Sequence, residues 1–356
     1  ANLDLTKTNL FVNRCMTFMM PLMMLIMNGV SVLIIYSGAH AVDNGTMQVG
    51  NVMAFIQYAM QIIMSFLMIT AMSIMLPRAN VAALRIDEVL KTEVSIQDSE
   101  TPVHPSESVK GEIEFDHVSF AYPEAGENVL TDISFKAKKG QTIAVIGSTG
   151  SGKSTLINLI PRYYDVTKGS VKVDGVDVRD MTQKELRDKL GYVPQKGVLF
   201  SGTIDSNIRY GKPEITDAQV KEAAEVAQAT EFIDTKPEKY ESPVSQGGTN
   251  VSGGQKQRLS IARAIAKDPE IFIFDDSFSA LDFKTDSQLR KALKEYTKDA
   301  TTVIVAQRIS TILGADQIIV LDDGHMAGIG THKELMANCE VYQQIARSQL
   351  SEEELA

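Results

Sequence analysis

A glycine-rich stretch, GSTGSGKST at residues 147–155, has the residue types and spacing to bind a polyphosphate. It fits the pattern G-x-x-x-x-G-K-[ST]. Glycines let backbone N–H groups close around phosphate oxygens, the lysine reaches the β- and γ-phosphates, and the hydroxyl after it ligates Mg²⁺. The residues expected to contact a nucleotide are Gly147, Ser148, Thr149, Gly150, Ser151, Gly152, Lys153, Ser154 and Thr155.

A second candidate for phosphate chemistry is the acidic pair that ends IFIFDD, residues 271–276. Four consecutive apolar residues predict a buried strand, and Asp275 leaves its carboxyl end. Open α/β sheets bind ligands at that edge. We therefore expect Asp275 to hold Mg²⁺ beside Ser154, directly or through water.

The elements around the loop supply the context that this chemistry needs. QTIAVI (141–146) is typical of a buried parallel strand, and STLINLIPRYY (154–164) has helical apolar spacing. The alternation of further strands and helices predicts a mainly parallel α/β core with an antiparallel piece attached. Strands are expected at residues 112–118, 128–137, 170–173, 190–193, 271–275, 301–306 and 317–321, and helices near 182–188, 216–228, 254–266 and 284–296.

Length and composition bound the kind of protein. The 356 residues suggest about two domains, and the net charge of −10 without a basic stretch argues against a nucleic-acid partner. The two cysteines, Cys15 and Cys339, lie far apart and imply no disulfide framework. Thirteen of the 16 methionines lie before residue 77, and the other three are Met181, Met326 and Met336. This uneven distribution marks a boundary in composition.

The N-terminal quarter is predicted to cross a membrane twice. Residues 15–36 and 52–76 contain no charged side chain, and 22 helical residues span about 33 Å, enough for a bilayer core. The alternative is a pair of buried helices in a large soluble domain. Lys7 and Arg14 precede the first span, and Arg78 and Arg85 follow the second. Positive charge favours the cytoplasmic side, so we expect both ends of the pair of spans in the cytoplasm. The protein is then a multi-pass protein of the cell membrane, with lipid around its spans.

Two side-chain types in the second span suggest contact with a ligand. Methionines recur every fourth residue on one helix face, which suits a cavity for varied apolar ligands. Two glutamines are expected to face a bundle interior rather than lipid. Ordinary helix packing is the alternative for both sets, which are Met60, Met64, Met68 and Met72, and Gln57 and Gln61.

Short motifs beyond the phosphate loop resemble the nucleotide-binding domain of ATP-binding cassette (ABC) transporters. VSGGQ (251–255), directly before a helical stretch, is similar to the signature LSGGQ. YVPQ (192–195) resembles the Q-loop, SALD (279–282) resembles the D-loop, and Tyr122 in SFAYP resembles the aromatic residue that stacks on adenine. The alternative for Tyr122 is a core aromatic at a strand end. The resemblance covers about residues 111–349.

This resemblance implies an α/β P-loop NTPase domain of ABC type, with antiparallel β and helical subdomains, that uses ATP and Mg²⁺. Gln195 would sense Mg²⁺ and the membrane domain. Two such domains pair head to tail in the family, so Ser252, Gly253, Gly254 and Gln255 would contact ATP held by a partner, and Asp282 also belongs to the nucleotide site.

The fused spans are similar to the last two helices of an exporter half-transporter. The implied organisation is a partial transmembrane domain at 1–90, a linker at 91–110, the nucleotide-binding domain at 111–350 and an acidic tail at 351–356. The chain begins at Ala1, and because such halves have six spans, four further helices are expected before it.

Three positions depart from the family pattern. Asp276 stands where a glutamate normally orients the attacking water, and Gln307 stands where a histidine normally contacts the γ-phosphate. Ser245 and Gln246 replace a Gly-Glu pair, which puts ordinary coupling to the membrane helices in doubt. Neutral drift is the alternative for each change. Because Asp276 and Gln307 act on the same phosphate, we expect hydrolysis slower by roughly 10²–10³ while ATP binding persists.

The pattern resembles the degenerate-site half of heterodimeric bacterial multidrug exporters. It implies ATP-driven export of drug-like or lipidic apolar compounds, together with a second half-transporter that carries the competent glutamate and histidine. Two other interpretations are a homodimer with two slow sites and an ATP-sensing regulator of a membrane partner.

Overall fold

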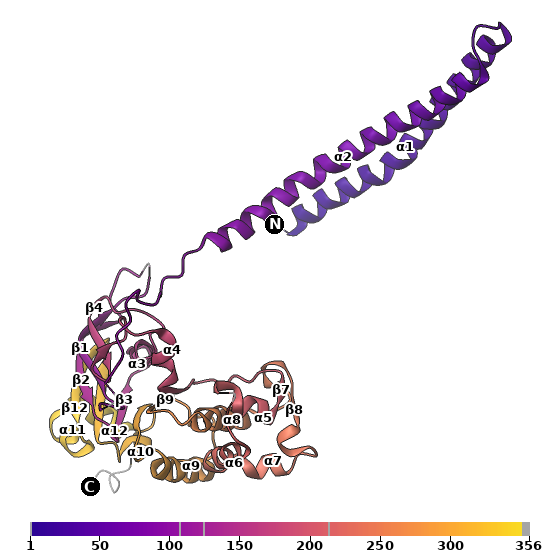
Figure 1. The fold of residues 1–356 in the computed structure, drawn as a ribbon. Coiled ribbons are helices and arrows are strands. Elements are labelled where there is room, and N and C mark those ends of the chain that lie inside the picture. Colours follow the sequence, from indigo (N-terminus) through magenta and orange to yellow (C-terminus); the bar gives the residue numbers. More distant parts are fainter. Residues whose placement is uncertain (1, 107, 124, 213, 351–356) are drawn as a thin grey trace. The chain divides into compact units, whose positions relative to one another are not determined.

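The computed structural model describes residues 2–350 apart from residues 107, 124 and 213, so the predicted acidic tail at 351–356 lies outside it. The chain divides into two compact units, Ala1–Val94 and Ser95–Ala356. Figure 1 shows long helices in the first unit and a mixed α/β arrangement in the second.

The first unit consists of α1 (Asn2–Asp43) and α2 (Val49–Lys91), which pack against each other. Both are long and apolar enough to cross a membrane, and no residue of α2 is buried. The predicted spans 15–36 and 52–76 lie inside these helices. Both helices continue past the apolar stretches into polar residues, and a 2.7 Å ion pair between Asp87 and Lys91 lies in the last turn of α2.

Hydroxyl groups within these helices are satisfied locally. Thr17, Ser31, Ser65, Thr70 and Ser73 each donate to the carbonyl oxygen four residues earlier. Such back-bonding leaves no free hydroxyl donor on the helix surface at these positions, which suits apolar surroundings.

The second unit contains two main sheets. One is a four-stranded antiparallel sheet in the order β2-β1-β4-β5, and the other has six strands in the order β12-β11-β3-β10-β9-β6, parallel except for β12. A short pair, β7 and β8, lies apart. The strands are β1 (Ile113–Phe120), β2 (Leu130–Ala137), β3 (Thr142–Gly147), β4 (Lys168–Val173), β5 (Val176–Asp177), β6 (Leu190–Val193), β7 (Gly202–Thr203), β8 (Pro243–Val244), β9 (Ile271–Asp275), β10 (Thr301–Val305), β11 (Gln317–Asp322) and β12 (His325–Gly330).

Helices cover the sheets or form a largely helical part beside them (Figure 1). They are α3 (Lys153–Leu159), α4 (Gln183–Asp188), α5 (Ile204–Ile208), α6 (Asp217–Val226), α7 (Thr230–Asp234), α8 (Gly253–Ala266), α9 (Phe283–Tyr296), α10 (Ile309–Ile312), α11 (His332–Asn338) and α12 (Glu340–Gln349). Single-turn 3-10 helices lie at Arg209–Gly211, Lys239–Glu241 and Gln246–Gly248.

Strand β3 shows how the sequence builds two cores. Alternate side chains of a strand point to opposite faces of a sheet. Ile143 and Val145 join the core between the two sheets, which also contains α3. Ala144 and Ile146 join the core on the other face, under α10 and α12. Burial on both faces explains the continuous apolar run before the phosphate loop.

Every strand and helix that we expect from the sequence is present, with ends shifted by a few residues. The predicted architecture is confirmed: two apolar helices precede an α/β domain with antiparallel and helical parts. The described residues between 92 and 112 form neither helix nor strand. Most of them belong to the second unit, in which Val103 donates its backbone N–H to Asp180 O.

Candidate functional site

Parallel pairing brings the predicted site segments to one edge of the six-stranded sheet. Asp275 at the end of β9 lies opposite Val305 at the end of β10, and Phe274 lies opposite Val193 at the end of β6. The segments that leave the carboxyl ends of β6, β9 and β10 therefore meet at the edge from which the phosphate loop leaves β3.

The phosphate loop needs glycine at the positions that the motif fixes. A Cβ on Gly147 would lie 2.1 Å from Leu321 O, so no side chain fits there. Gly150 and Gly152 adopt φ values of 86° and 94°, a region that side chains disfavour. Gly152 is also the N-cap of α3, and its cap has no side-chain acceptor. The loop thus presents backbone N–H groups and a helix N-terminus, which together suit an anion.

Lys153 folds over this loop. Its Nζ donates to Gly147 O at 3.0 Å and to Ser148 O at 2.7 Å. Burial lowers the pKa of this ammonium, while Asp276 and Asp275 act in the opposite direction. A cation that is partly desolvated and held only by carbonyl oxygens is well placed to pair with a phosphate.

The remaining loop residues differ in exposure. Ser148, Thr149 and Gly150 are exposed, whereas Ser151 is 2% exposed and its Oγ has no hydrogen-bond partner among the described residues. Thr155 is buried, and its Oγ1 lies 2.9 Å from the hydroxyl of Tyr122.

Ser154 and Asp275 come together as the sequence predicts. Ser154 Oγ donates to Asp275 Oδ1 at 2.9 Å, although 121 residues separate them. Burial raises the pKa of Asp275, with a further contribution from Asp276, and the Ser154 hydrogen bond and Lys153 oppose that rise. A hydroxyl and a carboxylate oxygen at this distance are the hard oxygen donors that Mg²⁺ prefers. The pair fits the predicted metal site.

Asp276 is held by two glutamine side chains. Its Oδ2 accepts hydrogen bonds from Gln307 Nε2 at 2.7 Å and from Gln195 Nε2 at 3.2 Å. Asp276 is 7% exposed and has a φ of 46°, in the left-handed region that aspartate tolerates better than most residues. The three predicted catalytic residues are therefore in direct contact. Gln195, predicted also as a metal ligand, donates to Asp276 and makes no hydrogen bond to Ser154 or Asp275 in the described residues.

Tyr122 lies beside the phosphate loop within an aromatic cluster. Besides its contact with Thr155, its ring packs edge-on against Phe120 and Tyr164, with centroids 5.0 and 5.1 Å away. It is half-buried. These contacts fit the core-aromatic alternative, and adenine stacking by Tyr122 stays a prediction.

The signature residues form the start of α8. Ser252 is the N-cap: its Oγ accepts the Gln255 N–H at 3.3 Å, and Gln255 Oε1 accepts the Ser252 N–H at 3.0 Å. Gly253 has open space where a Cβ would lie, and Gly254 has only the Ala280 carbonyl oxygen nearby, at 3.4 Å, and a leucine methyl. No hydrogen bond joins these four residues to the phosphate loop in the described part of the chain.

Asp282 caps another helix. Its side chain accepts the Thr285 N–H at 3.0 Å at the start of α9, which lowers the pKa of its carboxyl group. Ser245 and Gln246 are exposed, and Ser245 N donates to Asn250 Oδ1 at 3.0 Å. These residues lie before the signature without contacting the phosphate loop.

Two positioning residues were not expected from the sequence. Gln257 in α8 accepts the Gly197 N–H at 3.0 Å and donates to Pro194 O at 3.1 Å, so it fixes both sides of the segment that carries Gln195. Gln349, near the end of α12, donates to Gln307 O at 2.8 Å. The only sequence feature that points to Gln257 is its place directly after the GGQK of the signature segment. No local sequence pattern identifies Gln349.

Comparison with known proteins gives three findings. A family model described as ABC transporter matches residues 130–279. A Mycobacterium tuberculosis protein named "Uncharacterized ABC transporter ATP-binding protein" is 45% identical over 352 residues, which make up 98% of this chain and 60% of that protein. A Bacillus subtilis protein named "Putative multidrug export ATP-binding/permease protein" is 40% identical over 304 residues, 85% of this chain and 52% of that protein.

The solved structures add a similar fold. A bacterial Atm1-family ABC exporter with ATP bound has a TM-score of 0.76 and 31% identity, over 93% of this chain and 57% of that chain. The chain thus spans little more than half the length of the relatives it matches.

Proposed function

Because this chain carries the nucleotide-binding domain of the ABC transporter family, preceded by two apolar helices, we propose that it is part of a half-transporter that couples ATP to export across the cell membrane. The observation that carries the proposal is the contact between Ser154 and Asp275 at the end of a glycine loop, in a chain that also has two exposed apolar helices. The names of two similar proteins, a putative multidrug export protein and an ABC exporter, support export and a drug-like substrate. Lipidic compounds remain part of the proposal on the basis of the apolar helices.

The site residues divide the work at the ATP phosphates. The phosphate-loop N–H groups and Lys153 bind the β- and γ-phosphates, and Ser154 and Asp275 would hold Mg²⁺, which neutralises phosphate charge when bound. Lys153 needs only to exchange its two carbonyl acceptors for phosphate oxygens. The amide network at Asp276 then decides how well an attacking water is oriented.

We place this chain in the slow half of a heterodimer. A histidine at position 307 could become cationic and stabilise charge on the γ-phosphate, whereas an amide stays neutral. The Gln307 amide instead donates to Asp276, so the two groups that would act on water and phosphate contact each other. A loss of about 3–4 kcal/mol in transition-state stabilisation corresponds to a rate lower by roughly 10²–10³.

The signature residues serve the companion subunit in this proposal. Ser252 to Gln255 form an intact, capped helix start that contacts no phosphate-loop residue of its own chain among the described residues. Its N–H groups and helix dipole would face the γ-phosphate of ATP held by a partner. The chain would thus complete a fast site while holding its own ATP longer.

Transport in inverted membrane vesicles tests the function. Vesicles that contain the complete complex should accumulate a fluorescent cationic dye when MgATP is added outside, and Lys153→Ala in this chain should lower that uptake. Uptake without ATP, or equal uptake with and without the complex, would contradict the export proposal.

The protein that purifies with this chain tests the pairing. Mass spectrometry of the purified complex should find a second, different chain with glutamate and histidine at the positions matching Asp276 and Gln307. A complex that contains only this chain would replace the heterodimer with a homodimer that has two slow sites.

A further inference from the structure

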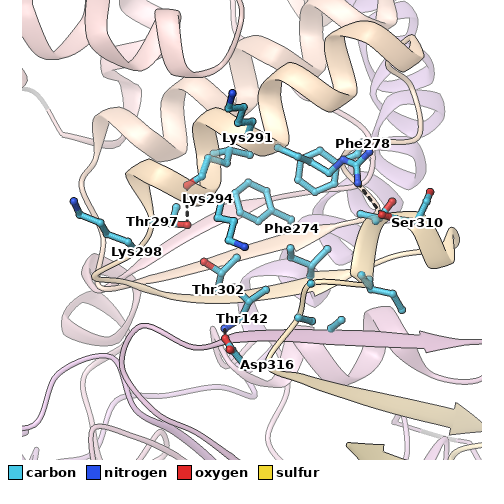
Figure 2. A pocket seen from close by; sticks show the side chains of 18 of the residues that line it. Thr142, Phe274, Phe278, Lys291, Lys294, Thr297, Lys298, Thr302, Ser310 and Asp316 are labelled. Carbon is cyan, nitrogen blue, oxygen red and sulfur yellow. Dashed lines mark hydrogen bonds between the residues drawn. The ribbon is translucent and has the colours of Figure 1, made fainter. Parts of the chain in front are cut away.

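A cavity of about 580 Å³ lies on the side of the six-stranded sheet covered by α9 and α10. Figure 2 shows its lining, in which Phe274 and Phe278 lie between α9 and the segment around Ser310. Its volume falls within the range of small-molecule sites. None of the site residues described above lines it, so it is distinct from the phosphate loop.

The walls of this cavity combine apolar and cationic side chains. Phe274, Phe278, Ile304 and Ile312 contribute apolar surface. Lys291, Lys294 and Lys298 line it from α9 and the turn that follows, and Lys291 and Lys294 form no ion pair with a described residue. Lys298 lies 3.5 Å from Glu295.

Two other charged groups line the cavity. Asp316 Oδ2 accepts the Thr142 N–H at 2.8 Å, which leaves this carboxylate negatively charged, so it cancels one of the two unpaired lysine charges. Arg290 binds Asp286 through two nitrogens, and its Nη1 donates to Ser310 O at 2.9 Å. The net charge that a ligand would meet in the lining is therefore positive.

A polar group inside the cavity also lacks a partner. Thr302 is 4% exposed, and its Oγ1 has no hydrogen-bond partner among the described residues. In Figure 2 the side chain of Lys294 extends from α9 into the cavity toward Thr302. An unsatisfied buried hydroxyl has a free-energy cost. Because this oxygen has almost no accessible surface, a ligand atom would reach it only after Thr302 or its neighbours move.

We propose that the cavity binds a small amphipathic anion, with an aromatic or branched apolar body on Phe274 and Phe278 and a single anionic head at Lys291 and Lys294. A carboxylate and a phosphate share the required head-group chemistry. Neither the ATP phosphates nor the transported compound is needed to explain these residues, so the site goes beyond the proposed export function.

The position of the cavity makes its ligand an effector of ATP turnover. Phe278 follows Asp276 by two residues, and Ser279 Oγ donates to Asp276 O at 3.0 Å in the same turn. Arg290 ties α9 to Ser310, three residues after Gln307. A ligand seated between α9 and the segment around Ser310 would lie against elements connected to Asp276 and to Gln307, so we expect it to alter the hydrogen bond between these two residues.

Photolabelling of the full chain in phosphatidylcholine nanodiscs tests the binding site. The probe is 4-(trifluoromethyl-diazirinyl)benzoate, and labelled peptides are located by mass spectrometry. We expect labels on peptides that contain Phe274, Phe278 or Thr302. Naphthoate and naphthyl phosphate should each reduce the labelling, and the concentrations that they require rank the carboxylate and phosphate head groups. Naphthylmethylammonium, a cation, should not reduce it.

Variants distinguish this cavity from other apolar surfaces. The double variant Lys291→Glu with Lys294→Glu should lower labelling at least tenfold. Gly314→Phe should do the same by filling the cavity, because a Cβ there meets open space and no positive φ forbids it. Lys221→Glu reverses the charge of an exposed lysine of α6 outside the lining. It is the control for charge reversal at the surface and should label normally. Photolabelling with 8-azido-ATP shows that each variant is folded.

Equal labelling of the parent and both cavity variants would overturn the proposal, as would competition by the cation that matches competition by the anions. Absence of labelling on the three expected residues would overturn it too. For the effector role, naphthoate should change ATP turnover of the complex at least threefold in the parent and leave Gly314→Phe unchanged. Turnover that responds equally in both would reject that role.

Discussion

Gln307 donates a hydrogen bond of 2.7 Å from its Nε2 to Oδ2 of Asp276. The bond joins the segment after β10 to the segment after β9, and the same oxygen also accepts from Gln195. Two neutral amides thus donate hydrogen bonds to one oxygen of the Asp276 carboxylate. A catalytic base would need a carboxylate oxygen to accept a hydrogen bond from the attacking water. This contact adds a geometric argument for the slow hydrolysis that we propose, beyond the identities of the two residues.

Restoring the family residues should restore hydrolysis. We expect Asp276→Glu combined with Gln307→His to raise ATP turnover at this chain's own site by about 10²-fold, corresponding to roughly 3 kcal/mol of transition-state stabilisation. Phosphate release is measured in the complete complex with the companion's site silenced. Each single variant serves as a control and should gain less, because the two side chains act together. No gain in the double variant would contradict the degenerate-site proposal.

Removing the loop lysine should weaken ATP binding without unfolding the domain. Lys153 donates only to two backbone carbonyl groups near the surface, so Lys153→Ala removes no buried ion pair. We expect at least a tenfold loss of 8-azido-ATP photolabelling, with an unchanged midpoint in pulse proteolysis. Lys221→Ala is the matched control and should label like the parent. Normal labelling of Lys153→Ala would contradict the assigned role of the loop.

Gln257 should control the order of the segment that carries Gln195. Gln257→Leu keeps the side-chain size but leaves the Gly197 N–H and the Pro194 carbonyl oxygen without their partners, at a cost of about 1–3 kcal/mol. Hydrogen exchange followed by mass spectrometry should show faster exchange at residues 195–199. Gln255→Leu, two residues earlier in the helix, should leave that exchange unchanged. Equal protection in Gln257→Leu and the parent would exclude the positioning role.

The strand–loop–helix order and the contact of Ser154 with Asp275 were predictable because both follow from the chain direction. Parallel strands end at one edge, so an acid that leaves a buried strand must lie near a loop that leaves another. The hairpin of β11 and β12 also had a signal, since Asp323 and Gly324 both adopt positive φ, as an Asp-Gly turn does. Strand β12 was nevertheless not among the expected strands, although this turn points to it.

Contacts made by side chains over long sequence distances were beyond such reasoning. Gln257 reaches back 60 residues to Gly197, and Gln349 reaches 42 residues to Gln307. Neither follows from periodicity or turn chemistry, because the orientation of the helices that carry them depends on tertiary packing. Tyr122 illustrates the same limit, since its contact with Thr155 required the loop and the antiparallel sheet to be placed together.

Glu114 should make the stability of the second unit depend on pH. Hydrogen bonds from Lys172 and Lys136 lower the pKa of its carboxyl group below its ordinary value of 4.5. A folded-state pKa below the unfolded value adds stability above the unfolded pKa, and that stability is lost as pH falls through the folded pKa. Glu114→Gln should therefore be less stable than the parent at pH 7 in pulse proteolysis. The difference should shrink as the pH falls below the ordinary pKa of 4.5 and vanish below the lowered folded-state pKa. A difference that stays constant with pH would contradict the ion-pair explanation.

Ser252 separates the structural role of the signature from its proposed role toward the partner's ATP. Its hydroxyl caps α8, so Ser252→Ala should lower stability by about 1 kcal/mol. Aspartate caps a helix as well as serine does, so Ser252→Asp should keep that stability. It would also place a carboxylate against the γ-phosphate, and like charges repel, so ATP turnover by the companion's site should fall at least tenfold. Ser252→Thr, which retains a neutral capping hydroxyl, is the control for size. Because only a site that faces a phosphate distinguishes the aspartate from the threonine, equal turnover in these two variants would mean that Ser252 does not contact the partner's nucleotide.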